Sequence, residues 1–275
     1  MTGRDSKETT SKSRAPYKLK RWTHIERDLR KERGPLLAGV DEVGRGPIAG
    51  PVVACAVIMP PEMRAIRGVD DSKMLTAAER NKLSVRITER ALACSLGAAS
   101  VHEIERINIY QASVLAMRRA LARLQVQPNH VIIDGKAMRT LPVPHTAIIH
   151  GDARCFSIAC ASIIAKVTRD RLMARLAVRY PGYLWERNVG YTTRAHIRGL
   201  DSHGITPHHR RSFFRVSQLM LDFDFVAGSA ESMDIECAIA EETAIVAADM
   251  GLDGPMPGAD VMRLGDGPVL NKLES

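Results

Sequence analysis

The sequence lacks any apolar run close to the roughly 20 residues that a membrane-spanning helix needs. Its first 16 residues, MTGRDSKETTSKSRAP, are polar and lack the apolar centre of a secretory signal. The five cysteines are scattered and form no C-x-x-C pair. We therefore expect no membrane span, no disulfide framework and no zinc site, but free buried thiols in a reducing cytoplasm.

Positive charge is unevenly distributed along the chain, although the net charge is only +8. Residues 34–220 carry 26 Lys and Arg against 14 Asp and Glu, whereas residues 221–275 carry 2 against 12. Residues 1–33 are also basic, with 11 against 5. A basic surface of this size favours a polyanionic partner such as nucleic acid. The alternative explanation of the charge is solubility alone.

These differences predict three segments. Residues 1–33 form a basic N-terminal extension, of which residues 1–16, rich in Ser, Thr and Lys, are expected to be disordered. Residues 34–220 form the body and contain no internal repeat. Residues 221–275 form an acidic C-terminal appendage. Because the appendage and the body have opposite charges, we hypothesise that the appendage competes with nucleic acid for the body.

The pattern of the body is a mixture of strands and helices. Two short patterns, Thr76-Ala-Ala-Glu79 and Ser100-Val-His-Glu103, are typical of capping boxes and predict helix starts, the first helix ending at about Ala93. Residues 153–179 also have a helical pattern. Five apolar or β-branched runs predict strands: LLAGV, GPVVACAVIM, LACSLGAASV, HVIID and HTAIIHGD. This order of elements indicates an α/β sheet with helices packed on it.

Acidic side chains follow three of the expected strands at their C-terminal ends. Asp41 follows LLAGV and precedes Glu42, Asp134 follows VII, and Asp152 follows AIIHG. Ligand sites of open α/β sheets gather at these ends, so we expect the carboxylates to lie together. Simpler explanations exist, because Asp134-Gly135 is a turn dipeptide and Asp152 could cap the next helix.

The adjacent pair Asp41 and Glu42 adds a geometric condition. Neighbouring side chains on a regular strand point to opposite faces, so the pair can share a site only if the strand ends or bulges between them. The loop after them, with Gly44, Gly46 and Gly50, favours such a break. Its glycines do not have the G-x-G-x-x-G spacing of a dinucleotide-binding loop.

The expected cluster of carboxylates requires compensation of its charge. Two like charges about 4 Å apart repel by ~4 kcal/mol at an effective dielectric constant of 20. The cluster therefore needs raised pKa values or a bound cation. Oxygen ligands favour Mg²⁺ or Mn²⁺ over zinc, and paired divalent ions promote displacement at phosphorus. The residues indicate a metal-dependent phosphodiester enzyme.

Several longer motifs occur in the order seen in one family. They are AGVDEVGRGPIAGPVV, DDSKML, NIYQASVLAM, VIIDGK, HGDARCFSIACASIIAKVTRDRLM, YPGY, GYTTRAH and HHRRSF. Over about residues 36–218 the chain resembles bacterial ribonuclease HII, the type 2 ribonuclease H. The resemblance implies a ribonuclease H-like mixed sheet flanked by helices, with a C-terminal helical lobe at about residues 153–220.

The resemblance also implies an activity. Members of this family use Mn²⁺ or Mg²⁺ in a two-metal hydrolysis of the RNA in RNA–DNA hybrids. They also incise 5′ of single ribonucleotides embedded in duplex DNA, as in ribonucleotide excision repair, and leave 3′-hydroxyl and 5′-phosphate ends. The family's catalytic and metal-binding tetrad matches Asp41, Glu42, Asp134 and Asp152. We expect a monomer, and a sliding-clamp partner is possible but unsupported, because residues 260–275 contain no convincing clamp-binding motif.

Substrate-binding residues follow from the same resemblance. The family's glycine–arginine–glycine sensor of the ribose 2′-hydroxyl matches Gly44, Arg45 and Gly46. Its junction tyrosine, which packs on the deoxyribose after the ribonucleotide, matches Tyr191. Lys73 falls where the family contacts substrate phosphate.

Other residues keep two interpretations. One phosphate ligand is expected among Lys166, Arg169 and Arg171. Phosphate contact and a helix-capping or structural role are both open for His208, His209, Arg210 and Arg211. Trp185 is expected to pack rather than to stack on a base. The alternative function is a non-catalytic hybrid- or DNA-binding protein of the same fold, and a resolvase-like nuclease is a further rival. The intact set of acids favours the ribonuclease.

Overall fold

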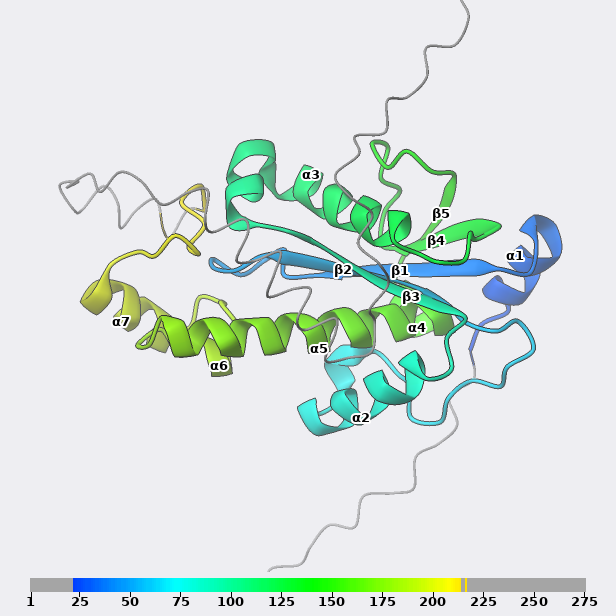
Figure 1. Cartoon of the computed structure of the whole chain (residues 1–275), viewed down its shortest axis with the longest axis horizontal. Helices are drawn as coiled ribbons and strands as arrows, with labels where there is room; N and C mark the ends of the chain where they lie inside the picture. Colours follow the sequence, from blue (N-terminus) through cyan, green and yellow to red (C-terminus); the bar gives the residue numbers. More distant parts are fainter. Residues whose placement is uncertain (1–21, 214–215, 217–275) are drawn as a thin grey trace, which may run out of the picture.

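The computed structural model describes residues 22–213 and residue 216 (Figure 1). The expected disordered residues 1–16, the acidic appendage 221–275 and the candidate clamp segment 260–275 lie outside the described residues. No helix in the described part of the chain is both long and apolar enough to cross a membrane. The elements in chain order are α1 (Ile25–Arg33), β1 (Leu37–Val43), β2 (Val52–Ile58), the 3-10 helix η1 (Ser72–Met74), α2 (Ala77–Thr88), β3 (Ala93–Ala99), α3 (Val101–Ala122), β4 (His130–Asp134), β5 (His145–Ile148), α4 (Gly151–Arg154), α5 (Phe156–Arg179), α6 (Trp185–Asn188) and α7 (Arg194–His203).

The five strands form one mixed sheet in the order β3-β2-β1-β4-β5. Strands β1, β2 and β3 pair antiparallel, whereas β4 runs parallel to both β1 and β5. The predicted α/β class with a mixed sheet is confirmed. Because β1, β4 and β5 run in the same direction, their carboxyl ends lie at one edge of the sheet, where the acids were expected.

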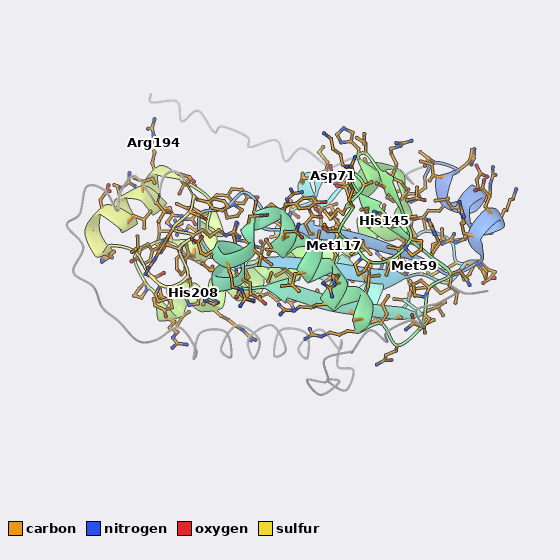
Figure 2. All side chains as sticks on the ribbon, turned by 90° about the horizontal axis from the view of Figure 1, so that it is seen from above. Met59, Asp71, Met117, His145, Arg194 and His208 are labelled. Carbon is orange, nitrogen blue, oxygen red and sulfur yellow. The ribbon has the colours of Figure 1, made fainter. Side chains whose placement is uncertain are left out.

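Helices cover both faces of the sheet (Figure 1). Helix α3 packs on one face and α5 on the other, and α2 packs against the outside of α5. Strand β2 serves both layers, because Ala54 and Ala56 belong to the core under α3 while Val53 and Val57 belong to the core under α5. Burial on both faces explains why this strand is a continuous apolar run. Met117 of α3 is fully buried in the first layer (Figure 2).

Both predicted helix starts are confirmed by their hydrogen bonds. The Thr76 side chain accepts from the Glu79 N–H, and the Glu79 carboxylate accepts from the Thr76 N–H. Ser100 and Glu103 form the same reciprocal pair at the start of α3. Helix α2 ends at Thr88, earlier than the expected end, because residues 89–92 turn the chain into β3, which begins at Ala93.

The two ends of the sheet carry different additions (Figure 1). At one end α1 packs against the body, where the buried Glu26 carboxylate accepts from the N–H and hydroxyl of Ser157. At the other end α6, α7 and the end of α5 enclose a separate core that contains Trp185 and Tyr183. Trp185 is fully buried, so its expected packing role is confirmed. The bounds of the three predicted segments stay predictions.

Candidate active site

The acidic site lies at the carboxyl ends of the parallel neighbours β1 and β4, where their residues are in register. Val40 of β1 is in register with Ile133 of β4, so Asp41 and Asp134 follow side by side. Asp134 ends β4, and Gly135 turns the chain with φ +83°. The Asp134 Oδ1 accepts a 2.6 Å hydrogen bond from the N–H of Gly151, which begins α4. Asp134 therefore belongs both to a turn and to the acidic site.

Asp152 lies inside α4 rather than at its start. The N-cap of this short helix is His150, which makes no capping hydrogen bond through its side chain. The side chain of Asp152 is buried, and it accepts a 2.9 Å hydrogen bond from Lys73 Nζ. The simpler interpretation of Asp152 as a helix cap is therefore wrong.

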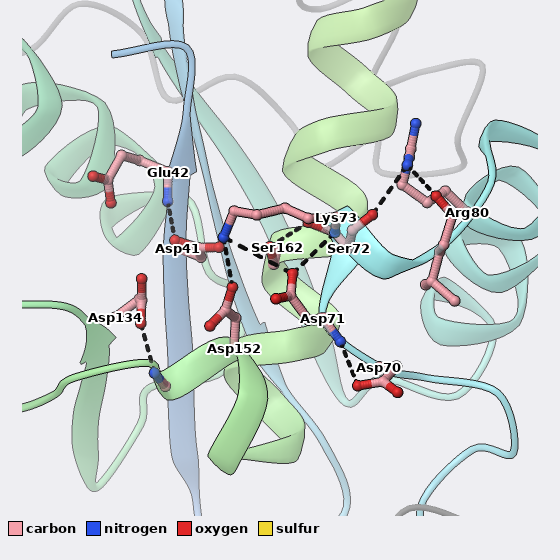
Figure 3. A network of polar contacts seen from close by, with 12 residues as sticks. Asp41, Glu42, Asp70, Asp71, Ser72, Lys73, Arg80, Asp134, Asp152 and Ser162 are labelled. Atoms are coloured by element: carbon pink, nitrogen blue, oxygen red, sulfur yellow. Dashed lines mark hydrogen bonds and ion pairs between the residues drawn. The ribbon is translucent and has the colours of Figure 1, made fainter. Parts of the chain in front are cut away.

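The predicted break between Asp41 and Glu42 is also wrong. Strand β1 runs through both residues and keeps regular register with β2. Asp41 shares the face of Val43, under α5, and Glu42 shares the face of Val40, under α3, so they lie on either side of the β1 ribbon (Figure 3). The charge of Asp134 nonetheless raises the pKa of both carboxyls, because β4 ends beside them. The end of β4, rather than a bulge in β1, brings the acids together.

Burial and mutual repulsion dominate the electrostatics of this site. Burial raises the pKa of Asp41 well above its usual value, and the charges of Glu42 and Asp134 add to the effect. Burial also raises the pKa of Glu42, although the Arg45 guanidinium opposes the shift. Burial raises the pKa of Asp134 against the hydrogen bond from Gly151. Carboxylates that are destabilised as anions in this way are typical of functional sites.

Lys73 supplies a positive charge to this cluster (Figure 3). Its Nζ lies 2.9 Å from Asp152 Oδ2 and 3.8 Å from Asp71 Oδ1, and 77% of its side chain is exposed. Among the residues that the structure describes, no three His, Cys, Asp or Glu side chains are arranged to hold a metal ion. The carboxylate oxygens are nevertheless the donor type that Mg²⁺ and Mn²⁺ prefer. The donor chemistry fits such an ion, and the ammonium stands beside these oxygens as a cation.

The glycine loop follows the acids directly, and its first two glycines, Gly44 and Gly46, differ in the space around them. Gly44 has φ +95°, and a Cβ there would overlap the Arg169 side chain and lie 2.7 Å from Pro51 O. A Cβ at Gly46 would meet only Tyr191 Cε1, at 3.7 Å. The Arg45 guanidinium lies 3.1 Å from Glu42 Oε1. The predicted substrate-binding loop therefore contacts the acidic site through Arg45 and opens toward the ring of Tyr191 at Gly46.

Comparison with known proteins decides the family. The sequence profile of the family described as Ribonuclease HII matches residues 38–217. The chain belongs to the ribonuclease HII family. Membership in this family identifies it as a ribonuclease. This is the family that the sequence motifs resemble.

Similar proteins extend the match over most of the chain. A ribonuclease HII of Granulibacter bethesdensis is 54% identical over 196 residues, which cover 70% of this chain and 90% of that protein. The ribonuclease H2 of Pyrococcus horikoshii has the same fold, with a TM-score of 0.59 and 24% identity over 68% of this chain and 98% of that one. A ribonuclease HIII solved with Mn²⁺, Bst-RNase HIII, has a TM-score of 0.52 and 18% identity, covering 68% and 70% of the two chains.

Two arginines of this ribonuclease HII chain hold the backbone around the glycine loop. Arg169 and Arg210 are fully buried and donate to backbone carbonyls around the glycine loop, so Arg169 is not the expected phosphate ligand. For Arg210 the structural alternative is confirmed. Lys166 Nζ pairs with Asp170 at 2.7 Å, and Arg171 donates to Asn81.

A histidine network behind Tyr191 gives His209 the structural role that the sequence left open, whereas the part of His196 in it was not expected. His196 Nδ1 lies 2.9 Å from the Tyr191 carbonyl and must donate to it, so His196 Nε2 accepts from Trp185 Nε1 and faces His209 Nε2 at 3.1 Å. Burial lowers the pKa of His196 and lowers that of His209 to about 3, so both rings are neutral at pH 7. Asn188 also fixes this segment, since its side chain bonds Tyr183 O and the Gly190 N–H. The signals in the sequence were the adjacent histidines of HHRRSF and the histidine that ends GYTTRAH.

Proposed function

We propose that this ribonuclease cuts the RNA of RNA–DNA hybrids and incises 5′ of single ribonucleotides embedded in duplex DNA. The products would carry 3′-hydroxyl and 5′-phosphate ends. One observation carries the proposal: the loop of Gly44, Arg45 and Gly46 contacts the acidic site through Glu42 and faces the ring of Tyr191. A group that senses the ribose would therefore lie beside the group that acts on its phosphate.

The acidic tetrad would hold Mn²⁺ or Mg²⁺. Support comes from the oxygen-only donor set, from the raised pKa values of its buried carboxyls and from the Mn²⁺ in the similar ribonuclease HIII structure. When bound, such ions activate water and stabilise the charge that develops on the phosphate. The ligands would be Asp41, Glu42, Asp134 and Asp152.

Substrate recognition would use groups that surround the acids. The backbone at Gly46 would approach the 2′-hydroxyl, because this position carries no side chain and opens toward Tyr191. The ring of Tyr191, 45% exposed, would pack on the sugar that follows the ribonucleotide. Lys73 would contact a phosphate, since its exposed ammonium lies beside the acids. Most of the affinity would come from the basic surface.

The alternative is a non-catalytic protein that binds hybrids or DNA. Buried carboxylates near phosphate repel it, so a protein selected only for binding gains nothing from this cluster. We also propose a monomer that works in the cytoplasm, where the four described cysteines, all free thiols, would stay reduced. The sliding-clamp contact stays a prediction.

One experiment tests the proposed function. End-labelled duplexes containing one ribonucleotide, no ribonucleotide or a full RNA strand are incubated with Mn²⁺, with Mg²⁺ or with chelator. We expect cutting 5′ of the single ribonucleotide and within the RNA strand, only with metal, and no cutting of the all-deoxy duplex. Binding of these duplexes without any cutting would instead support the non-catalytic alternative.

A further inference from the structure

The N–H groups of the glycine loop are available to a ligand. The hydrogen bonds of the described residues include none donated by the N–H of Arg45 or of Gly46. The carbonyls of Gly44 and Arg45 instead turn inward and accept from Arg210. In a planar trans peptide the C=O and the following N–H point in opposite directions. The N–H groups of Arg45 and Gly46 therefore point away from Arg210.

Arg210 fixes this loop from behind. Its Nη1 donates to Arg45 O at 2.9 Å, its Nη2 donates to Gly44 O, and its Nε and Nη2 both donate to Gly50 O, at 3.0 and 2.7 Å. One rigid guanidinium thus holds both ends of the loop. A backbone N–H of Gly50 donates to His208 O, which joins the loop to the same segment.

Arg169 joins the loop to the segment of Tyr191. Its Nε donates to Pro51 O at 2.9 Å and its Nη2 to Ala49 O at 3.0 Å, while its Nη1 donates to Val189 O at 2.8 Å. The N–H of Ile48 also donates to Gly190 O. The guanidinium of Arg169 therefore joins the glycine loop to the segment that carries Tyr191.

This arrangement is unusual energetically. Burying a cation is costly unless it is paired, and in the described part of the chain neither arginine forms an ion pair with a carboxylate. Burial lowers the pKa of Arg169 to about 10 and that of Arg210 to about 9, so both stay charged at pH 7. A purely structural contact could use neutral groups, whereas a guanidinium offers a planar fork that fixes several carbonyls at once.

We propose that Arg210 and Arg169 are positioning residues for substrate recognition, an inference that rests on the proposed function. Arg210 orients the N–H groups of Arg45 and Gly46 toward the ribose 2′-hydroxyl. Arg169 sets the spacing between this loop and Tyr191, and therefore between the ribose and the sugar that follows it.

The test uses the full chain with Arg210→Lys and Arg169→Lys, because lysine keeps the charge but cannot span several carbonyls. We measure kcat and KM on the single-ribonucleotide duplex and on the continuous hybrid, at matched salt. Arg210→Lys is expected to lower kcat/KM on both substrates by about 100-fold, the scale of a misplacement of ~1 Å. Arg169→Lys is expected to harm the single-ribonucleotide duplex about tenfold more than the hybrid, a difference of about 1.4 kcal/mol.

Arg119→Lys is the matched control. Arg119 of α3 also donates to a backbone carbonyl, that of Ala98 in β3, but it pairs with Glu103 of the same helix, and these hydrogen bonds do not reach the loop or the segment of Tyr191. We expect this variant to leave the ratio of the two substrates unchanged, and thermal unfolding reports the folded fraction of every variant.

Three outcomes would overturn the inference. They are unchanged rates in both folded variants, equal losses on both substrates for Arg169→Lys, and failure of both variants to fold, which would make the arginines structural. Absence of cutting by the wild-type protein would instead refute the proposed function, so the two failures can be told apart.

Discussion

The acidic edge of the sheet and the glycine loop are neighbours, yet their buried charges have different surroundings. At the edge, carboxylates of one sign gather around Asp134, with raised pKa values and an exposed lysine as their partner. In the loop, two buried guanidiniums use their N–H groups on backbone carbonyls.

This difference separates two tasks. At the edge the carboxylates repel one another, and a bound cation relieves this repulsion. This property suits a metal ion that binds there and acts on phosphate. The carbonyls of the loop are held internally by Arg210, which leaves the N–H groups of Arg45 and Gly46 for a ligand on a rigid recognition surface. Substitutions at the edge should therefore affect turnover, and substitutions in the loop should affect recognition of the ribose.

The largest effect is expected for Asp134→Asn at the edge. The substitution keeps the size of the side chain but removes one negative charge, so turnover should fall on the order of 100- to 1,000-fold. Binding of the duplex should be nearly retained, because phosphate affinity comes from the basic surface. Single-turnover rates and Kd values measure the two separately, with the exposed Asp201→Asn in α7 as control. A wild-type rate would reduce Asp134 to a turn residue.

Two alanine substitutions in the loop should behave differently. Gly46→Ala should fold normally, because its Cβ meets only Tyr191, but should lower kcat/KM about 100-fold on both substrates by displacing the ribose. Gly44→Ala should lower the free energy of unfolding by roughly 2 kcal/mol or more, because of its positive φ and its overlap with Arg169. Urea unfolding and kinetics compare the pair. Full activity of Gly46→Ala would show that the ribose does not approach there.

Tyr191→Ala should separate recognition of the sugar that follows from recognition of the ribose itself. The ring would pack on a deoxyribose, so cutting at a single embedded ribonucleotide should fall about tenfold, and cutting of the continuous hybrid should fall less. Tyr191→Phe, which keeps the ring, is the matched control and should retain both activities. Equal losses on the two substrates for Tyr191→Ala would contradict this role.

The smallest effect concerns Lys73 and metal affinity. Because its ammonium pairs with Asp152, Lys73→Met should tighten Mn²⁺ binding to the substrate-free protein, by up to about fivefold for an exposed pair worth about 1 kcal/mol. Calorimetric titration measures this affinity without any turnover. Lys82→Met on α2 is the control. Weaker Mn²⁺ binding after Lys73→Met would mean that the lysine orders the acids rather than competing with the ion.

Local signals made much of the fold predictable. Capping boxes such as Thr76 and Glu79 act within one turn of helix, and the buried strands are apolar because both faces are covered. The order of the acids along the chain was informative for the same reason, since strand ends such as Asp134 are local features.

The remaining features depend on partners distant in sequence. Strand β1 continues through Asp41 and Glu42 because β2 pairs with it there, which the glycines after it do not reveal. The roles of Arg169 and Arg210 depend on burial against the loop more than 100 residues away in the chain. A basic sequence motif looks the same whether its arginine binds a phosphate or a backbone carbonyl.

The most direct test of the two tasks is a binding measurement that needs no turnover. Asp134→Asn, alone and combined with Gly46→Ala, is titrated with a duplex containing one ribonucleotide and with the all-deoxy duplex, at one salt and one Mn²⁺ concentration. The account predicts that Asp134→Asn prefers the ribonucleotide duplex, and that adding Gly46→Ala removes this preference without weakening binding of the all-deoxy duplex. A preference that survives Gly46→Ala, or that is already absent in Asp134→Asn, would contradict the account.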